Sequence, residues 1–221
     1  MPRTCYAPGC SESASGYSTL CRKHKQAQRR HGSPTQIALT SHELRPYVAL
    51  VDARKARNPH SEAWVMLETR WSAIVGASRA TLQRYAEGQV SLRHAVQAAH
   101  QLSQVAEGVE PWVVIKTALA MFILQDQQPR RFTSDEAFDF QLVRRVLRLA
   151  PANAGTYWDQ QTGKVRRVYR DVPPRTIRAI AAPLKEAFGA PGLMLATKER
   201  EDAQRGAEEH KRLTEALGDL Q

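Results

Sequence analysis

Four residues within the first 24 positions have the types and the spacing of a metal site. They follow the pattern Cys-x4-Cys-x10-Cys-x2-His and are Cys5, Cys10, Cys21 and His24. Thiolate and imidazole groups are the usual ligands of tetrahedral Zn²⁺ in proteins, and they commonly come in close pairs. Since four protein ligands leave no position for a catalytic water, the pattern predicts a structural zinc ion. The alternative is three thiols without a metal and an exposed histidine.

The chain around these ligands supports the metal interpretation. Residues 1–34 are polar and rich in turn-forming residues, with too few large apolar side chains for a core of their own. A bound metal would therefore supply most of the folding free energy of this segment. All three cysteines of the chain lie here, and an odd, clustered number favours a metal site over disulfides. His31 is a reserve ligand, with a solvated or phosphate-contacting histidine as the preferred interpretation.

The same segment resembles a known family. Its Gly9-Cys10 pair, the pattern Leu20-Cys21-x-x-His24 and the string Arg-Arg-His-Gly at 29–32 are typical of a short Cys3His zinc finger. This finger occurs in proteins of bacteriophages and mobile elements, and the resemblance covers residues 5–32. It implies zinc binding and proximity to nucleic acid, and it implies no reaction.

Basic residues dominate the end of this segment and the chain as a whole. The 32 Lys and Arg residues exceed the 22 Asp and Glu residues, for a formal net charge of +10. Such a balance makes a polyanion the first partner to expect. The finger contributes a basic run without acidic residues, which consists of Arg22, Lys23, Lys25, Arg29 and Arg30. This run predicts contacts to the phosphates of double-stranded DNA. The alternative is a face that is merely solvated.

A helix-turn-helix is predicted within residues 71–88. Gly76 can adopt the left-handed conformation of a tight turn, and Ser78 is a good cap for the helix that would follow. Residues 61–106 resemble the Cro-like phage-repressor family, chiefly through Gly-x-Ser-Arg-x-Thr-Leu-x-Arg-Tyr-x-x-Gly at 76–88. The resemblance implies that the second helix enters the major groove. Two packed core helices would show the same pattern. The residues implied to face DNA are Ser78, Arg79, Ala80, Gln83 and Arg84.

The sequence of the carboxy-terminal half predicts a second helical unit. Residues 112–124 are apolar on nearly all sides, which predicts a buried central helix. Residues 157–170 predict a lone β-hairpin. It is either a wing that contacts DNA through Arg166, Arg167 and Arg170, or an exposed hairpin whose charged side chains only keep it soluble. The arginines at 144, 145 and 148 are interpreted as partners of a helix dipole. Pro183, Gly189 and Pro191 predict interruptions before a long, net acidic final helix, which suits a homo-oligomer or a protein partner.

These patterns predict a mainly α-helical protein in three units. Residues 1–34 form the zinc finger, 40–108 a helix-turn-helix domain, and 109–221 a helical unit with one hairpin and a charged final helix. The apolar run is too short to span a bilayer and no signal peptide is present, so we expect a cytoplasmic, nucleoid-associated protein without a membrane partner. The expected function is sequence-specific DNA binding without catalysis, as a transcriptional regulator or DNA-organising factor of a phage, plasmid or transposon. The alternatives are a nuclease or recombinase-associated subunit that is targeted by the finger, and a structural phage assembly protein.

Overall fold

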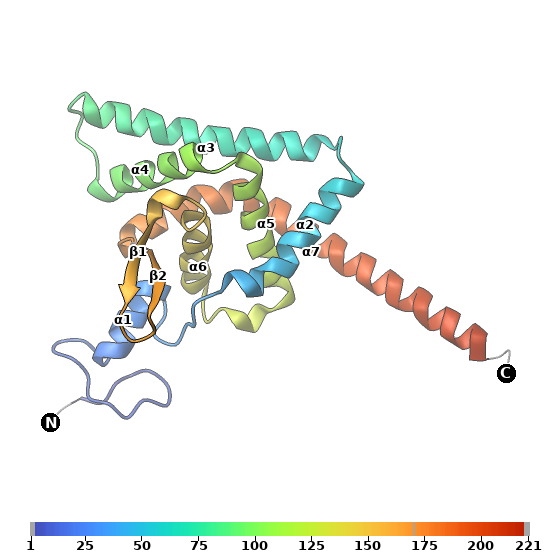
Figure 1. The fold of residues 1–221 in the computed structure, drawn as a ribbon, viewed down its shortest axis with the longest axis horizontal. Helices are drawn as coiled ribbons and strands as arrows, with labels where there is room; N and C mark the ends of the chain where they lie inside the picture. The colour runs from blue at the N-terminus through green and yellow to red at the C-terminus, as the bar shows by residue number, and fades with distance from the viewer. Residues whose placement is uncertain (1–2, 170, 219–221) are drawn as a thin grey trace.

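The computed structural model describes residues 3–169 and 171–218 and is mainly helical with one β-hairpin, as expected (Figure 1). Strands β1 (Ala154–Asp159) and β2 (Lys164–Tyr169) form an antiparallel pair in which Trp158 lies opposite Val165. The elements are α1 (Arg22–His31), α2 (Ser41–Arg57), α3 (Glu62–Ala86), α4 (Arg93–Gly108), α5 (Pro111–Gln127), the 3-10 turns η1 (Pro129–Arg131) and η2 (Pro151–Asn153), α6 (Asp135–Leu147), β1 (Ala154–Asp159), β2 (Lys164–Tyr169) and α7 (Pro174–Gly218).

Helix α5 is the centre of the core, which confirms the expectation for residues 112–124. It is apolar on all sides because α2, α3, α6 and α7 pack around it, and Val114, Ala118 and Ile123 are fully buried. The same hydrophobic cluster extends from Leu39 to Ala196. The expected units 40–108 and 109–221 therefore share one continuous core, whereas the finger has a small cluster of its own.

The turn expected at Gly76 is wrong, because α3 is one helix of 25 residues that runs through this position. Its buried apolar stripe includes Trp71, Ile74 and Val75 and ends just before the glycine, and beyond it Ser78 is buried and Leu82 is half-buried. Packing of that stripe outweighs the cost of a helical glycine, which is about 1 kcal/mol relative to alanine. Ser78 does not cap a second helix. Its buried hydroxyl donates a hydrogen bond of 2.9 Å to the carbonyl oxygen of Ile74 within the same helix.

The interruptions expected before the final helix are also wrong. Helix α7 is continuous over 45 residues, and both Pro183 and Pro191 lie inside it. Gly189 and Gly192 face Phe122 of α5, and a Cβ atom built on Gly192 would lie 2.6 Å from the Cβ of Phe122. The glycines thus allow two helices to approach closely, and this packing holds α7 helical through its prolines.

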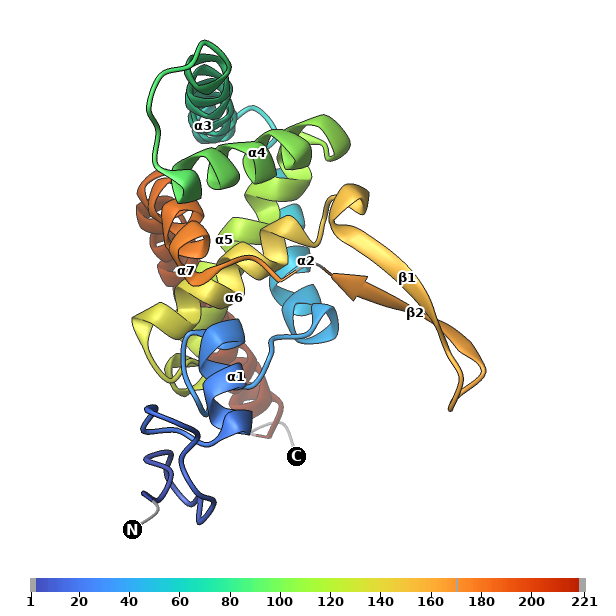
Figure 2. The same ribbon diagram turned by 90° about the vertical axis from the view of Figure 1, so that its left-hand side faces the viewer.

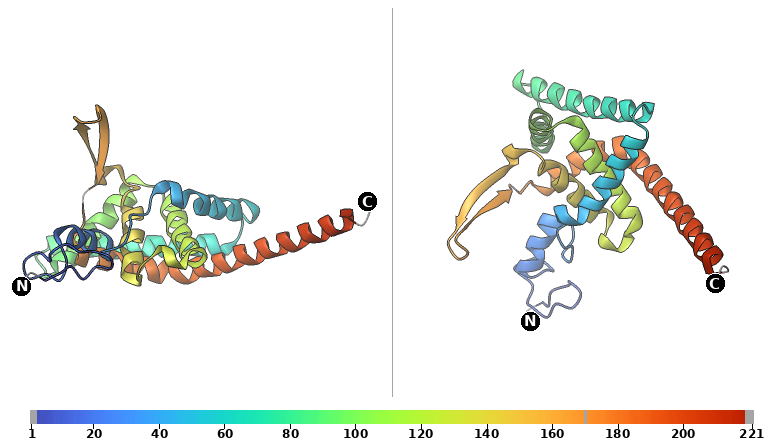
Figure 3. Two further views of the ribbon diagram at one scale, coloured as in Figure 1. Left: turned by 90° about the horizontal axis from the view of Figure 1, so that it is seen from below. Right: turned by 45° about the vertical axis from the view of Figure 1, so that its right-hand side comes forward.

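The last part of α7 extends away from the body (Figure 3). Arg54 of α2 secures the helix near its point of departure through ion pairs to Glu199 at 2.7 Å and Asp202 at 2.6 Å. Residues 203–215 are exposed throughout. An oligomeric or protein partner for this segment stays a prediction. Among the described residues, none of the helices combines the length and the apolar character needed to cross a membrane.

Candidate metal centre and basic surface

The four predicted metal ligands come together at the amino-terminal end of α1. The ligand atoms of Cys5, Cys10, Cys21 and His24 all lie within 4.8 Å of one another. Nδ1 of His24 is 3.4 Å from Sγ of Cys5 and 3.3 Å from Sγ of Cys21, and the two sulfur atoms of Cys10 and Cys21 are 4.0 Å apart. Within the described ranges, no second group of His, Cys, Asp and Glu side chains has such an arrangement.

Local structure explains how a short, polar segment positions these ligands. Gly9 has a φ of +72° in the turn that brings Cys10 back toward Cys5, and the N–H of Cys10 donates to the carbonyl oxygen of Ala7 at 3.1 Å. Cys21 is the N-cap of α1. His24 lies three residues further on, so that it faces the same side as Cys21. One turn and one helix start therefore present the two ligand pairs.

The donor set and its dimensions fit tetrahedral zinc. Bond lengths of about 2.3 Å to sulfur and about 2.0 Å to nitrogen place ligand atoms about 3.8 Å apart for S···S and about 3.5 Å apart for S···N. The measured 4.0, 3.4 and 3.3 Å agree with these edges. All four positions come from the protein, so the site could hold a metal in a structural role.

The thiols differ in their electrostatic surroundings. Burial raises the pKa of Cys5, but hydrogen bonds from the backbone of Cys21 and Ala7, together with His24, outweigh burial and lower the pKa to about 6. The N–H of Cys21 lies 3.2 Å from this sulfur. A backbone hydrogen bond from Glu12 lowers the pKa of Cys10, yet burial and the neighbouring thiols raise it overall. Of these two thiols, Cys5 is therefore the better prepared to bind a cation as thiolate.

His31, the reserve ligand, contacts α6 instead of the metal-ligand cluster. Its Nδ1 lies 3.2 Å from Nε2 of Gln141 on α6, away from the four-ligand cluster. Gly32, which ends α1 with a φ of +78°, packs directly against the backbone of Glu136 and the ring of Phe140. The finger is thus docked on α6 by its last two helical positions and its C-cap.

Gly32→Ala should loosen this docking and destabilise the protein by about 1–2 kcal/mol, since a positive φ disfavours alanine. In addition, the new Cβ atom would lie 2.8 Å from the carbonyl oxygen of Glu136. Gly16→Ala is the matched control, because Gly16 has a φ of +58° and no atom within 4 Å of the added methyl group. Hydrogen exchange of the α1 amides and thermal melting would measure the difference. Equal effects of the two substitutions would show that Gly32 has no docking role.

The predicted basic residues of α1 are all exposed. Arg22, Lys25 and Arg29 are spaced by three and four residues, so they form one stripe along the helix. Lys23 and Arg30 lie on an adjacent face, and Nε of Arg30 donates to Oδ2 of Asp171 at 2.8 Å. The structure thus leaves the stripe accessible, while Arg30 is turned toward the body.

On α3, the predicted DNA contacts divide between the surface and the core. Arg79, Ala80, Gln83 and Arg84 are exposed, whereas Ser78 is buried and is not available to DNA. Amide Nε2 of Gln83 donates to Oε1 of Glu87 at 3.0 Å. Tyr85, in the same part of the helix, is 56% exposed. Contact with DNA at the exposed positions stays a prediction.

The hairpin residues are only partly described. Arg166 and Arg167 occupy β2 opposite Tyr157 and Thr156. Their side chains, and all of Arg170, lie outside the described part of the chain. The strands project from the body, with both Tyr157 and Trp158 exposed (Figure 2). The hairpin expected over 157–170 is confirmed, with strands that begin at Ala154 and end at Tyr169.

The sequence alone did not predict a cluster of arginines at the carboxy-terminal end of α6. Arg144, Arg145 and Arg148 were interpreted as partners of the helix dipole, but Arg144 also lies beside Arg30 of α1. Nη1 of Arg144 donates to the carbonyl oxygen of Arg30 at 3.0 Å. No local sequence signal could reveal this arrangement, because the two helices are more than 100 residues apart along the chain.

Comparison with known proteins adds no relative. The chain matches no family model, no curated protein and no solved structure. The resemblances to a phage zinc finger and to Cro-like repressors therefore stay predictions that rest on the residues quoted for them.

Proposed function

We propose that this protein is a zinc-containing DNA-binding protein that acts as a regulator or accessory factor without chemistry of its own. The observation that carries the proposal is the junction of the Cys3His cluster with α1. Cys21 caps this helix, and its exposed face presents Arg22, Lys25 and Arg29. Zinc would fold the finger and thereby hold three cations in one row for backbone phosphates.

The arrangement of the other basic segments supports the same partner. The carboxy-terminal end of α3, the hairpin and α1 all lie along one side of the molecule, which faces the viewer in Figure 2. The acidic end of α7 extends from a different side (Figure 3). A long polyanion on the first side could reach all three segments while the final helix stays free for a protein partner.

Sequence preference is assigned in this proposal to α3. Arg79 and Gln83 are one helical turn apart on its exposed end. Arginine pairs well with guanine and glutamine with adenine, and each good base contact contributes about 1–3 kcal/mol of discrimination. Without a turn at Gly76, this end of α3 would enter a groove as the extension of a long helix rather than as the second helix of a pair.

The double variant Lys25→Gln with Arg29→Gln tests the proposal. It should weaken binding to duplexes of every sequence alike and lower the slope of log affinity against log salt concentration by about 2, since each lost phosphate contact contributes about 0.9. Fluorescence anisotropy with labelled duplexes over a salt series measures both quantities. The matched control is Arg45→Gln with Arg212→Gln, two exposed arginines on α2 and α7. A wild-type protein without salt-dependent DNA affinity would refute the function, and equal slopes for the two double variants would remove α1 from the interface.

A further inference from the structure

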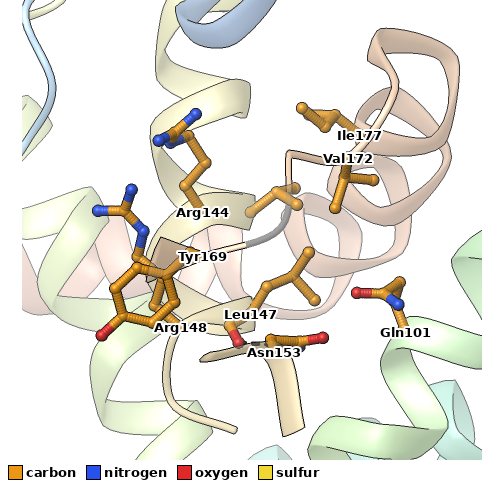
Figure 4. A pocket seen from close by; sticks show the side chains of 9 residues that line it. Gln101, Arg144, Leu147, Arg148, Asn153, Tyr169, Val172 and Ile177 are labelled. Atoms are coloured by element: carbon orange, nitrogen blue, oxygen red, sulfur yellow. Dashed lines mark hydrogen bonds between the residues drawn. The ribbon is translucent and has the colours of Figure 1, made fainter. Parts of the chain in front are cut away.

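Four arginines gather where α1 meets α6 at the base of the hairpin: Arg30, Arg144, Arg145 and Arg148. Arg144 and Arg148 also line a small cavity with Tyr169 and Val172. Figure 4 shows both of their guanidinium groups pointing to the same side, away from Leu147 and the apolar lining. Charge is thus concentrated at one edge of this cavity.

Each guanidinium group is held by a specific contact. The carboxylate of Asp171 bridges two of them, with 2.8 Å to Nε of Arg30 and 3.5 Å to Nη1 of Arg144. Arg148 stacks over the ring of Tyr169 at 4.6 Å, and Nη1 of Arg145 donates to Oγ of Ser41 at 3.0 Å. The bridge shows that a single anion can reach both α1 and α6.

The positive charge of the cluster is not balanced by the acidic groups near it. Asp171 interacts with Arg30, Arg144 and Arg148, and Glu43, the carboxylate near Arg145, is bound by Arg131 at 2.8 Å. Burial, followed by the charge of Arg148, lowers the pKa of Arg144 to about 10. Burial and then Arg144 and Arg30 lower the pKa of His31 to about 4, so this histidine is neutral and adds no charge near pH 7. Such crowding of like charges disfavours folding unless an anion relieves it.

The dimensions place that anion at the mouth of the cavity. The cavity itself has a volume of about 20 Å³, which admits a water molecule and no more. The side chains of Arg30 and Asp171 are 47% and 45% exposed, so the edge of the cavity beside the Asp171 carboxylate is open to solvent and a phosphate there would share or replace its contacts. Guanidinium groups match the geometry of phosphate oxygens with paired hydrogen bonds.

We propose that Arg30, Arg144 and Arg148 form a phosphate-binding site, and that its ligand is a backbone phosphate of DNA held between the finger and the base of the hairpin. This inference rests on the proposed function and adds a position to it. The site lies beside, and not on, the α1 stripe of Arg22, Lys25 and Arg29. It would couple the docking of the finger on α6 to the presence of DNA.

Arginine modification of the wild-type protein tests the site without any substitution. Inorganic phosphate should protect Arg30, Arg144 and Arg148 from phenylglyoxal, as mapped by mass spectrometry, and should leave Arg45 reactive. A short DNA duplex should give the same protection at a lower concentration. If neither phosphate nor DNA protects the three arginines more than Arg45, the site is wrong.

The double variant Arg144→Gln with Arg148→Gln gives the second measurement, with Arg45→Gln as its control. It should lose the rise in melting temperature that inorganic phosphate causes, bind duplexes about tenfold more weakly and lower the salt slope by about 2. If the DNA affinity and salt slope of this variant equal those of the wild type, DNA is not the ligand of this site, while the proposed function stands. If phosphate protects the wild-type arginines but no duplex binds, the proposed function is wrong and the site holds a different phosphate compound. If the variant fails to fold, the modification experiment decides alone.

Discussion

Cys10→Ser should abolish metal binding and unfold the finger, while the helical body keeps its cooperative melting. The purified wild-type protein should carry about one zinc ion per chain, since the four ligands form one closed site. A structural zinc contributes about 10–16 kcal/mol to a small finger, far more than its few buried side chains provide. Those side chains are Cys5, Ala7, Leu20 and Cys21, with Cys10 packed against them, so that three of the five residues are ligands.

The body should tolerate this loss because its core begins at Leu39 and contains no residue of the finger. Metal analysis, limited proteolysis and calorimetry would measure the three parts of the prediction. Tyr17→Ser is the matched control, since this side chain lies in the same segment and is fully exposed. Chelation of the wild-type metal should reproduce the effect of Cys10→Ser. A protein without metal but with an ordered finger, or a body that melts together with the finger, would contradict the prediction.

Loss of the finger should also remove most DNA affinity. Helix α1 starts at Arg22, directly after the ligand Cys21, so the basic stripe has no fixed geometry without the metal. We therefore expect the Cys10→Ser variant to bind duplex DNA more weakly than the Lys25→Gln, Arg29→Gln double variant. Stronger binding by the cysteine variant would place the interface outside the finger.

Gly192→Val should destabilise the helical body by about 3 kcal/mol, a large share of a typical folding free energy of about 5–15 kcal/mol. The first atom of the new side chain would lie 2.6 Å from the Cβ of Phe122 and 3.0 Å from its ring. Since a Cβ atom moves only with its backbone, α5 and α7 would have to separate. That separation would disturb the central helix on which α2, α3 and α6 also pack.

Gly206→Val is the control for this substitution, because Gly206 lies in the same helix with no atom within 4 Å of an added Cβ. Its effect should stay within about 0.5 kcal/mol, since valine and glycine differ little in helix propensity. Chemical denaturation would compare the unfolding free energies of the two variants, provided that the dependence of this free energy on denaturant concentration is the same for both. Equal stabilities would mean that the close approach of α5 and α7 is not required.

Features determined by short stretches of chain were predictable. The finger follows from ligand spacing and a turn at Pro8-Gly9, and the hairpin follows from its Gly163 turn, where φ is +61°. The central helix α5 was recognisable because complete burial requires an apolar surface on all sides. In each case, the residues that decide the conformation are neighbours in the chain.

The same local signals failed where distant packing competes with them. Gly76, Pro183 and Pro191 are helix breakers by propensity, yet α3 and α7 continue through them. Apolar side chains of α3 up to Val75, and of α7 on both sides of its prolines, are buried in the core. The cost of a helical glycine or proline is about 1–3 kcal/mol, which the burial of a few large side chains exceeds.

By itself, the sequence determined a mainly helical protein with a Cys3His cluster, a basic helix and a β-hairpin, because spacing, capping and turn chemistry act over a few residues. Only the tertiary structure decided that Gly32 docks the finger on α6 and that Gly192 lets α7 approach Phe122. It also decided that Arg30 meets Arg144 across 114 residues. Such contacts depend on the directions in which whole helices cross, and those directions follow from how the complete set of side chains fills one core.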